Sequence, residues 1–493
     1  MDAQIRILAN NHATKIPRIF GTRKPHEFSV SKNFSVIEHP KDFPKFSGFS
    51  KIGGLNMINS IKAAVTHLKT LSGDIEIIAH HDTDGITSAA ILTKALQREE
   101  RKFNVRILKG INNDVVRGLM KDASKIIFLL DFGSGHVGKF IGRSNVFIID
   151  HHEINVKNIP HEVSVINPLM FNEAQNICAS ALTYLFAKEM NELNIDLAHL
   201  AIIGMISESR EAKSFKIGEE ILKDSEDLKI RKSILLFPAT RPLHKALEFS
   251  NIFLPGITGS SEGVSQLLNN AGIKLKEDEN HRTLLDLNEE ETTKLLEVLC
   301  IRKEDETAFG NIYLMKFFNQ FEDARELSTL INACGRMDRG YIALEMCLGS
   351  KRAKSIAESI YGEYKHLIIS SLKTAVSIEK IETENYVIIN SGKRINDNLL
   401  SVIVSIMSSS FVYSNGKIIV GMADRNDGNI KISSRICGEC NDIDLRKVIE
   451  PLLKLVNGEG SGNNRSAGGI IPKDKSEEFI ELIQRDMGLI LKH

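Results

Sequence analysis

Short apolar runs alternate with longer helical stretches along the first half of the chain. The runs that fit buried strands are 75–80, 104–108, 125–131, 145–150 and 163–167. The stretches that predict apolar or amphipathic helices are 56–72, 177–192 and 197–206. This alternation is typical of a mostly parallel sheet with helices on both faces. We therefore expect an α/β fold for this part of the chain.

The pattern changes after residue 210. Lys and Glu alternate over 213–232, a turn-rich loop covers 254–260, and a helical stretch over 286–300 begins with several acidic residues. Acidic residues in a first turn complement the helix dipole, so this helix is well specified. The block contains no catalytic constellation. We interpret it as a connecting or inserted module, serving either as a spacer or as a docking site for a partner or nucleic acid.

The last third returns to strands and turns. Residues 421–435 predict two strands joined by an Asn-Asp-Gly turn, which is typical of a hairpin. A glycine-rich loop follows at 458–469, and such loops let backbone N–H groups approach phosphate. We expect a smaller α/β domain here. The expected domains are 1–215 with an extended N-terminal lead-in, 216–310 for the module, and 311–493.

Composition limits the classes of function. The 493 residues are enough for roughly two to four domains. Because the formal net charge is zero, binding to nucleic acid requires local basic patches. Six cysteines are scattered, and the single Cys437-x-x-Cys440 pair is weak evidence for zinc. We see no signal peptide and no apolar run long enough to span a membrane, so we expect a cytoplasmic protein without membrane partners.

Polar residues with metal-binding potential follow three of the predicted strands. His80, Asp82 and Asp84 occupy alternate positions, which share one face of an extended chain. Asp131 ends another strand and precedes a glycine-rich turn, and Asp150-His151-His152 ends a third. Carboxyl ends of parallel strands meet at one edge of a sheet, so we expect these side chains to converge. Capping or core-satisfying roles would explain one such strand end but explain three together poorly.

The residue types indicate a metal centre. Crowded carboxylates repel one another unless cations compensate their charge. A mixed Asp and His set suits manganese, zinc or iron better than calcium, which prefers oxygen ligands alone. The set is large enough for two ions that share one bridging carboxylate, an arrangement that can activate water and bind a phosphoryl group.

These three motifs, in this order, resemble the DHH phosphoesterase superfamily. The C-terminal stretches resemble the DHH-associated C-terminal domain, and the resemblance covers about residues 50–490. Softer matches at 240–242, 254–259 and 332–336 are similar to archaeal RecJ-like proteins. Those relatives are single-strand-specific exonucleases, some of which associate with the GINS complex, and their eukaryotic relative is a catalytically silent part of the replicative helicase.

The resemblance implies a role for each matching residue. One ion would be bound by His80, Asp82 and Asp131, and the second by Asp84, Asp131, His151 and Glu208. The alternative for Glu208 is an ion pair with Arg210 in place of metal binding. Asp150 would orient His151, and His152 would face the scissile phosphate for proton transfer. The residues implied in nucleic-acid binding are Asn332, Arg336, Ser434, Arg435, Gly460, Gly462, Asn463 and Arg465. Two positions depart from the family pattern, which has Asp in place of Glu208 and His in place of Asn463.

We therefore expect a metal-dependent exonuclease that hydrolyses single-stranded DNA or RNA in replication or repair. Two divalent ions are implied, with manganese preferred and magnesium as the alternative. A second hypothesis is a weakly active or inactive fork scaffold that binds GINS and the replicative helicase. A third is a phosphoesterase for small oligonucleotides or small molecules. The sequence leaves open the digestion polarity, the preference for DNA or RNA, and the oligomeric state.

Overall fold

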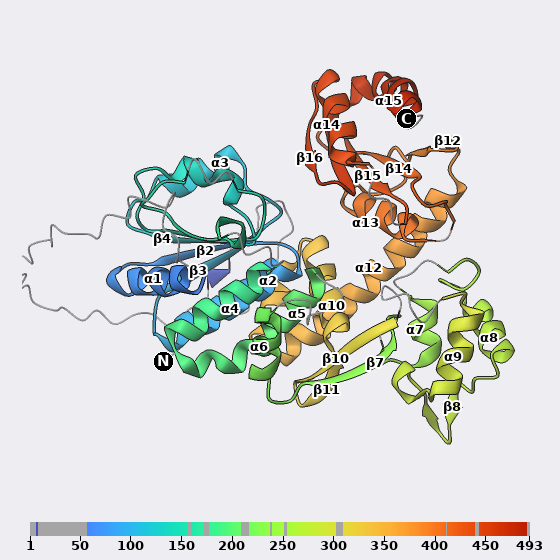
Figure 1. Ribbon diagram of the computed structural model, residues 1–493, viewed down its shortest axis with the longest axis horizontal. Helices are drawn as coiled ribbons and strands as arrows, with labels where there is room; N and C mark the ends of the chain where they lie inside the picture. Colours follow the sequence, from blue (N-terminus) through green and yellow to red (C-terminus); the bar gives the residue numbers. More distant parts are fainter. Residues whose placement is uncertain are drawn as a thin grey trace, which may run out of the picture.

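Figure 1 shows the computed structural model of the chain. It describes residues 6–7, 57–154, 159–171, 177–208, 216–236, 239–250, 254–301, 309–410, 412–438 and 443–490. Most of the N-terminal lead-in, Cys440 and the segment 209–215 lie outside the described residues. Among the helices that are described, none combines the length and the apolar character needed to cross a bilayer.

A six-stranded parallel sheet forms the first domain, as the alternating pattern predicts. Its strands are β1 (Arg6–Ile7), β2 (Ile75–His80), β3 (Phe103–Leu108), β4 (Ile126–Leu130), β5 (Val146–Ile149) and β6 (Ser164–Ile166). Their order is β1-β3-β2-β4-β5-β6, and every pair is parallel. The carboxyl ends of β2, β4 and β5 are therefore neighbours at one edge, which is where the polar motifs begin.

Helices cover both faces of this sheet, so the predicted architecture is confirmed. One face packs against the apolar sides of α1 (Met57–Thr70), α2 (Thr83–Arg98), α4 (Ala179–Met190) and α5 (Ala198–Glu208). The other face packs against α3 (Asn113–Met120) and the 3-10 helix η1 (Ser134–Phe140). Short 3-10 turns η3 (Pro168–Met170) and η4 (Glu192–Leu197) connect the elements. Because both faces are covered, the central strands β4 and β5 are apolar along their whole length.

The hydrophobic cores divide the chain differently from the expected domain limits. The first core also includes α10 (Ala324–Arg336), α11 (Gly340–Cys347) and the first half of α12 (Lys351–Ser377). These helices follow residue 310, yet α10 packs on α2 and α5, and α11 packs on α2. The reason is that most of their buried apolar residues pack against the first domain. The expected domain boundaries, 1–215, 216–310 and 311–493, stay a prediction.

The middle block folds around a core of its own. A three-stranded antiparallel sheet joins β7 (Lys229–Ile234), β10 (Phe309–Phe317) and β11 (Gln320–Asp323). The other elements are α7 (Leu243–Glu248), α8 (Ser261–Asn270), β8 (Lys276–Glu277), β9 (Asn280–His281), η6 (Leu284–Asp286) and α9 (Glu289–Val298). The preceding helix α6 (Lys216–Asp224) packs instead into the core of the first domain. We call residues 239–301 the middle module; at its start, Thr240 and Arg241 both bond to the buried Glu326 of α10.

This attachment should respond to a single substitution. Glu326→Ala would remove the acceptor of the Thr240 hydroxyl, 2.6 Å away, and the partner of the Arg241 guanidinium. We expect the free energy of unfolding to fall by about 1–3 kcal/mol and amide hydrogen exchange to accelerate across 239–301. Glu358→Ala is the control, because its exposed carboxylate lies 3.5 Å from Arg241 and should contribute less than about 1 kcal/mol. Unchanged exchange in the module of the Glu326 variant would contradict this attachment.

The C-terminal domain contains a second six-stranded sheet. Its strands are β12 (Ile381–Glu382), β13 (Tyr386–Asn390), β14 (Ile418–Asp424), β15 (Asn429–Ile436), β16 (Glu459–Gly462) and β17 (Ser466–Pro472). Their order is β12-β13-β14-β15-β17-β16, with only the β13–β14 pair parallel. Helix α13 (Asp397–Ser408) covers one face; α14 (Leu445–Leu455) and α15 (Ser476–Ile490), preceded by η7 (Lys473–Lys475), cover the other.

Two sequence patterns in this domain had different outcomes. The hairpin predicted around the Asn-Asp-Gly turn is confirmed, because β14 and β15 pair antiparallel on either side of it. The predicted glycine-rich loop over 458–469 is instead largely the strand pair β16–β17. Glycine allows these strands to pack closely, since a Cβ at Gly460 would lie 2.3 Å from the carbonyl oxygen of Gly468. The glycines here therefore serve sheet packing.

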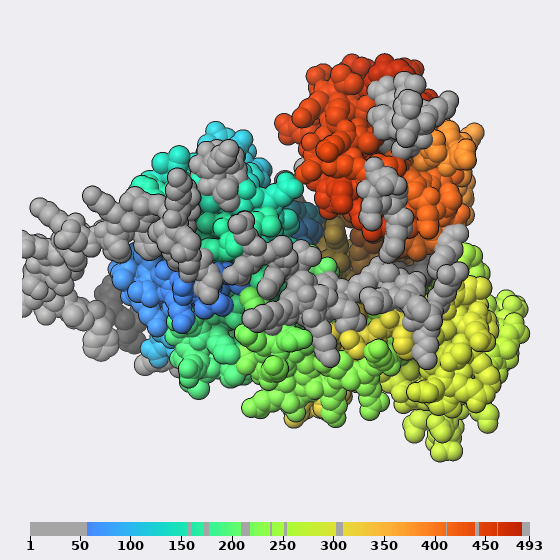
Figure 2. All heavy atoms as spheres, in the orientation of Figure 1, coloured from blue at the N-terminus to red at the C-terminus, as the bar shows by residue number. Residues whose placement is uncertain are grey.

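The first and the C-terminal domains stand side by side, with α12 leading from one to the other (Figure 1). Figure 2 shows a notch between the blue-green surface of the first domain and the red surface of the C-terminal domain. Polar contacts connect the two domains. Lys109, just after β3, lies 3.4 Å from the Asn398 Oδ1 atom of α13, and Arg446 of α14 lies 3.1 Å from Glu153.

Candidate metal centre

The first motif begins where β2 ends and α2 starts. Asp82 is the N-cap of α2, and its Oδ1 atom accepts a hydrogen bond from the Gly85 N–H at 3.1 Å. The other oxygen, Oδ2, lies 2.8 Å from Nδ1 of His80. That same ring nitrogen lies 3.1 Å from Oδ2 of Asp131. Although burial opposes protonation, the two carboxylates raise the pKa of His80 to about 10.

Asp131 occupies the centre of the cluster in a strained conformation. Its φ angle is +62°, a left-handed value that side chains other than glycine rarely adopt. Gly133 follows with φ +117°, so the chain turns sharply at the end of β4. The carboxylate is only 1% exposed, and its Oδ1 atom has no hydrogen-bond partner among the described residues. Strain and an unsatisfied buried oxygen at one residue are typical of a functional site.

The Asp-His-His motif follows β5. The Asp150 carboxylate accepts hydrogen bonds from the N–H groups of Ser134 at 2.9 Å and His151 at 2.8 Å. It also contacts Nδ1 of His152 at 2.7 Å. The aspartate therefore orients the ring of His152, whereas we expected it to orient that of His151. Nε2 of His151 instead points to Oδ1 of Asp131, 3.4 Å away.

Asp84 is fully buried and braces a neighbouring helix. Its two oxygens accept hydrogen bonds from the N–H groups of Ala179 at 2.7 Å and Ser180 at 2.9 Å, in the first turn of α4. A carboxylate is stabilised at a helix N-terminus by the unpaired N–H groups and the helix dipole. This use was not visible in the sequence, because Ala179 lies 95 positions away. The ligand role of Asp84 stays a prediction.

Glu208 is the last residue of α5 and has an exposed side chain. Desolvation of its carboxyl group, followed by repulsion from Asp84 and Asp82, raises its pKa to about 7. The carboxyl group of Glu208 thus lies close enough to Asp84 and Asp82 for their negative charges to repel it. Its role as a metal ligand stays a prediction, and Arg210, its other expected partner, lies outside the described residues.

The donor set fits divalent metal ions. Two groups of three residues each bring one ligand atom apiece within 4.8 Å of one another, and they are His80, Asp82, Asp131 and Asp131, His151, His152. Asp131 belongs to both groups, as a bridging ligand would. Burial, followed by repulsion from Asp82 and Asp84, raises the pKa of Asp131 to about 8. The ionised form of this carboxyl group is therefore disfavoured unless positive charge lies nearby, and a metal ion would supply that charge.

Helix α10 lies directly against the metal-binding turn. A Cβ at Gly335 would lie 1.7 Å from the carbonyl oxygen of His81, so only glycine permits this approach. Thr83 also donates its hydroxyl hydrogen to the carbonyl of Ser328 in α10, at 2.8 Å. Burial, followed by repulsion from His80 and Arg336, lowers the pKa of His81 to about 3. The close packing thus places Arg336 beside the metal centre.

The C-terminal domain brings more cations toward Arg336. Burial and repulsion from Arg336 lower the pKa of both Lys431 and Arg435 on β15. Alternation along the strand puts Lys431, Ser433 and Arg435 on one face. Ser434 points the other way and donates to the carbonyl of Ala467 at 2.6 Å. Sequence reasoning therefore missed Lys431 and Ser433, which the two-residue spacing from Arg435 could have identified.

The other expected nucleic-acid-binding residues have varied positions. Asn332 is partly buried in α10, one turn before Arg336 and on the same face. Gly460 and Gly462 are part of the β16–β17 ladder. Asn463 accepts hydrogen bonds from the N–H groups of Arg465 at 3.0 Å and Ser466 at 2.9 Å and so closes the turn, while the Arg465 side chain donates to the carbonyl of Gly438. The turn adjoins the start of α14, whose Arg446 contacts Glu153 next to the Asp-His-His motif.

Comparison with known proteins identifies the class. Residues 74–205 match the DHH family N-terminal domain, residues 237–307 the DHH-CID domain, and residues 384–488 the DHHA1 domain. The chain belongs to the DHH superfamily. Within it, the fold is RecJ-like. An uncharacterised protein of Methanocaldococcus jannaschii is 28% identical over 444 residues, covering 84% of this chain and 94% of that protein.

Solved structures share the fold at low sequence identity. RecJ of Thermus thermophilus in complex with Mn²⁺ has a TM-score of 0.54 at 14% identity, covering 88% of this chain. This chain spans just over half (55%) of that RecJ. CDC45 of Entamoeba histolytica has a TM-score of 0.59 at 13% identity, covering 86% of this chain and 98% of CDC45. A manganese-bound exonuclease RecJ has a TM-score of 0.52 at 14% identity, covering 87% and 94%.

Proposed function

We propose that the protein is a two-metal phosphodiesterase that acts as an exonuclease on single-stranded DNA or RNA in replication or repair. One observation carries this proposal: Asp131 is shared by two groups of residues that could hold a metal ion, and Arg336 lies near the turn that carries the first group. Lys431 and Arg435 add positive charge near Arg336. Membership of the DHH superfamily and the fold likeness to manganese-bound exonuclease RecJ support it. A narrow notch between two domains would favour single strands over duplexes.

Each residue of the site would have a specific role in the reaction. One divalent ion would be held by His80, Asp82 and Asp131, and a second by Asp131, His151, Asp84 and Glu208, with manganese preferred and magnesium as the alternative. When bound, such ions activate water and neutralise charge on the phosphoryl group. His152, oriented by Asp150, would exchange a proton with the reacting phosphate. Arg336 and Arg435 would bind the phosphate backbone through charge-assisted hydrogen bonds.

The role of His152 makes a prediction of its own. His152→Gln should lower kcat by about 10²–10⁴-fold, because a positioned proton-transfer group contributes on that scale. Asp150→Asn should lower kcat by about 10–100-fold, because it acts through the orientation of the ring. Manganese affinity, measured by calorimetry, should change less than about tenfold in the His152 variant. A parallel loss of affinity and kcat would instead make His152 primarily a metal ligand.

A nuclease assay tests the proposed function. Single-stranded DNA and RNA, labelled at one end or the other, would be incubated with the full chain and Mn²⁺, and a duplex of the same sequence would serve as a control. We expect stepwise release of mononucleotides from the single strands only, with none in EDTA. Activity on dinucleotides alone would favour the small-molecule phosphoesterase. Absence of cleavage by a chain that binds Mn²⁺ would refute the enzyme proposal.

The scaffold hypothesis remains the alternative because the CDC45 fold matches this chain over most of its length. Under this hypothesis the chain would bind GINS and the replicative helicase, with the middle module as the docking surface. Glu208 and Asn463, which depart from the family pattern, would then reflect weakened chemistry. Co-elution of the intact chain with GINS, together with absent cleavage, would select this alternative.

A further inference from the structure

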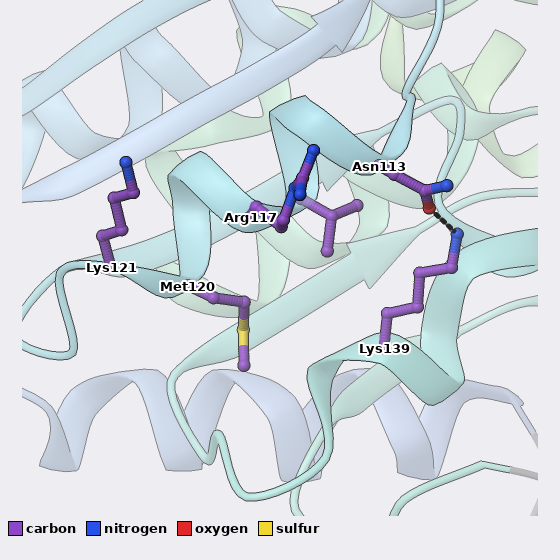
Figure 3. A pocket seen from close by; sticks show the side chains of 6 residues that line it. Asn113, Arg117, Met120, Lys121 and Lys139 are labelled. Carbon is purple, nitrogen blue, oxygen red and sulfur yellow. Dashed lines mark hydrogen bonds between the residues drawn. The ribbon is translucent and has the colours of Figure 1, made fainter.

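A shallow basic groove lies on the face of the first domain that α3 and η1 cover. It has a volume of about 710 Å³, and its lining residues are Asn113, Val116, Arg117, Met120, Lys121 and Lys139. Figure 3 shows these side chains, with Lys139 reaching from η1 to Asn113 of α3. Three of the lining residues are basic and none is acidic. We call this surface the α3–η1 groove.

The groove keeps much of its positive charge available. Lys139 donates a hydrogen bond to the neutral amide oxygen of Asn113 at 2.5 Å. Arg117 pairs with Asp114 on the same helix. Among the described residues, no carboxylate forms an ion pair with Lys121 or Lys139. Both lysines are exposed, and the buried Val116 and the partly buried Met120 form an apolar floor between the charges.

The η1 helix leads from the candidate metal centre toward the groove. The η1 helix begins at Ser134, whose N–H group donates to Asp150 at 2.9 Å. Lys139 lies five residues further along η1, about 10 Å away at roughly 2 Å per residue. On the other side, α3 starts after the loop that carries Lys109, which contacts Asp338 next to α10 at 2.6 Å. A single-stranded nucleic acid that leaves the metal centre along η1 would therefore reach Lys139 of this groove.

We propose that the α3–η1 groove binds the phosphate backbone of a single-stranded nucleic acid outside the metal centre. This inference rests on the proposed function and adds a second contact site for the same substrate. Lysines act as point charges on phosphate, so the contact is independent of base sequence and sensitive to salt. The site therefore favours long strands over short ones, because a short strand occupies the metal centre without reaching Lys121.

The test compares two matched double variants of the full chain. Lys121→Gln/Lys139→Gln removes the two unpaired charges of the groove. Lys62→Gln/Lys69→Gln removes two exposed lysines from α1, which covers the opposite face of the same sheet. Binding of a labelled strand longer than about 16 nucleotides and one shorter than about 4 nucleotides would be measured by fluorescence anisotropy in EDTA, over a range of salt concentrations. Cleavage of both strands would be measured in a separate assay with Mn²⁺.

We expect the groove variant to reduce the slope of log affinity against log salt by about 1.4 for the long strand, since each phosphate contact contributes about 0.7. The α1 variant should keep the slope of the unchanged chain, and cleavage of the short strand should be equal in all three proteins. Equal slopes for the long strand would overturn the inference and leave an acidic protein as the partner of the groove. A matching loss on the short strand would also overturn it, by placing the lysines in the metal centre. Failure of the proposed function is distinct, because the unchanged chain would then cleave neither strand.

Discussion

Asp131→Asn should abolish manganese-dependent cleavage, with a loss of at least about 10³-fold in kcat/KM. Asp131 is the residue common to both ligand groups, so its replacement removes a ligand from each. Metal ions contribute several kcal/mol to the stabilisation of a phosphoryl transition state, and each 1.36 kcal/mol corresponds to a factor of ten in rate. The measurement is the rate of mononucleotide release, together with the manganese stoichiometry by calorimetry.

Asp122→Asn is the matched control. Asp122 lies in the same domain on an exposed turn, where its carboxylate accepts hydrogen bonds from Ser124. This variant should retain full cleavage and full manganese binding. Cleavage by the Asp131 variant at the rate of the control would refute the shared-ligand site.

The same Asp131 substitution should stabilise the metal-free protein. Burial, together with Asp82 and Asp84, raises the folded-state pKa of Asp131 from 3.8 to about 8. An acid with a raised folded-state pKa destabilises the folded state when it is ionised, so stability is lost as the pH rises from 3.8 through 8. Asn removes this loss, and we expect about 1–3 kcal/mol more stability at neutral pH in EDTA. Chemical denaturation at several pH values would measure it, and a lower stability of the variant would contradict the repulsion that we infer.

Gly335→Ala is expected to damage both folding and function. The new Cβ would lie 1.7 Å from the carbonyl oxygen of His81, so α10 must move away from the metal-binding turn. Overpacking of this kind costs about 1–3 kcal/mol of unfolding free energy. The shift would also carry Arg336 away from the substrate, so kcat/KM should fall in the fraction that folds.

Gly362→Ala in α12 provides the comparison. A Cβ at Gly362 would meet no atom within 4 Å, and Ala is favoured over Gly inside a helix by about 0.5–1 kcal/mol. This variant should therefore gain stability and keep its activity. Denaturant unfolding and kcat/KM measured on both variants would check the pair, and similar stability changes at the two glycines would disprove the close contact.

Much of the fold was accessible from the sequence because local patterns determine it. Apolar runs located strands β2 to β6 of the first sheet to within one or two residues, whereas β1 lies in the expected lead-in. Parallel pairing then placed the polar ends of β2, β4 and β5 together. The hairpin at 424–429 followed from its turn residues. The division of the cores was not accessible in this way, since the apolar faces of α10 and α11 meet the first domain through contacts between segments more than 100 residues apart.

Details of the site depended on side-chain geometry that spacing alone does not encode. From the sequence, Asp150 could orient either of the two histidines that follow it. In the structure, the turn after β5 brings the ring of His152 to the Asp150 carboxylate. Asp84 occurs at the same strand end as Asp82, yet its carboxylate is used by the first turn of α4. Glycines at 458–469 had two interpretations, a phosphate loop or a tightly packed strand pair, and only the packing of α14 and β17 around them distinguishes the two.

The long helix α12 has a mechanical consequence. Its 27 residues span about 40 Å at 1.5 Å per residue, and it joins the first core at one end to the C-terminal sheet at the other. Because the helix is long, a tilt of about 5° at Lys351 would displace Ser377 at its other end by about 3.5 Å. An ion pair between Lys354 and Glu322 anchors the N-terminal end of α12. A tilt at this end of α12 would thus change the width of the notch between the first and the C-terminal domains.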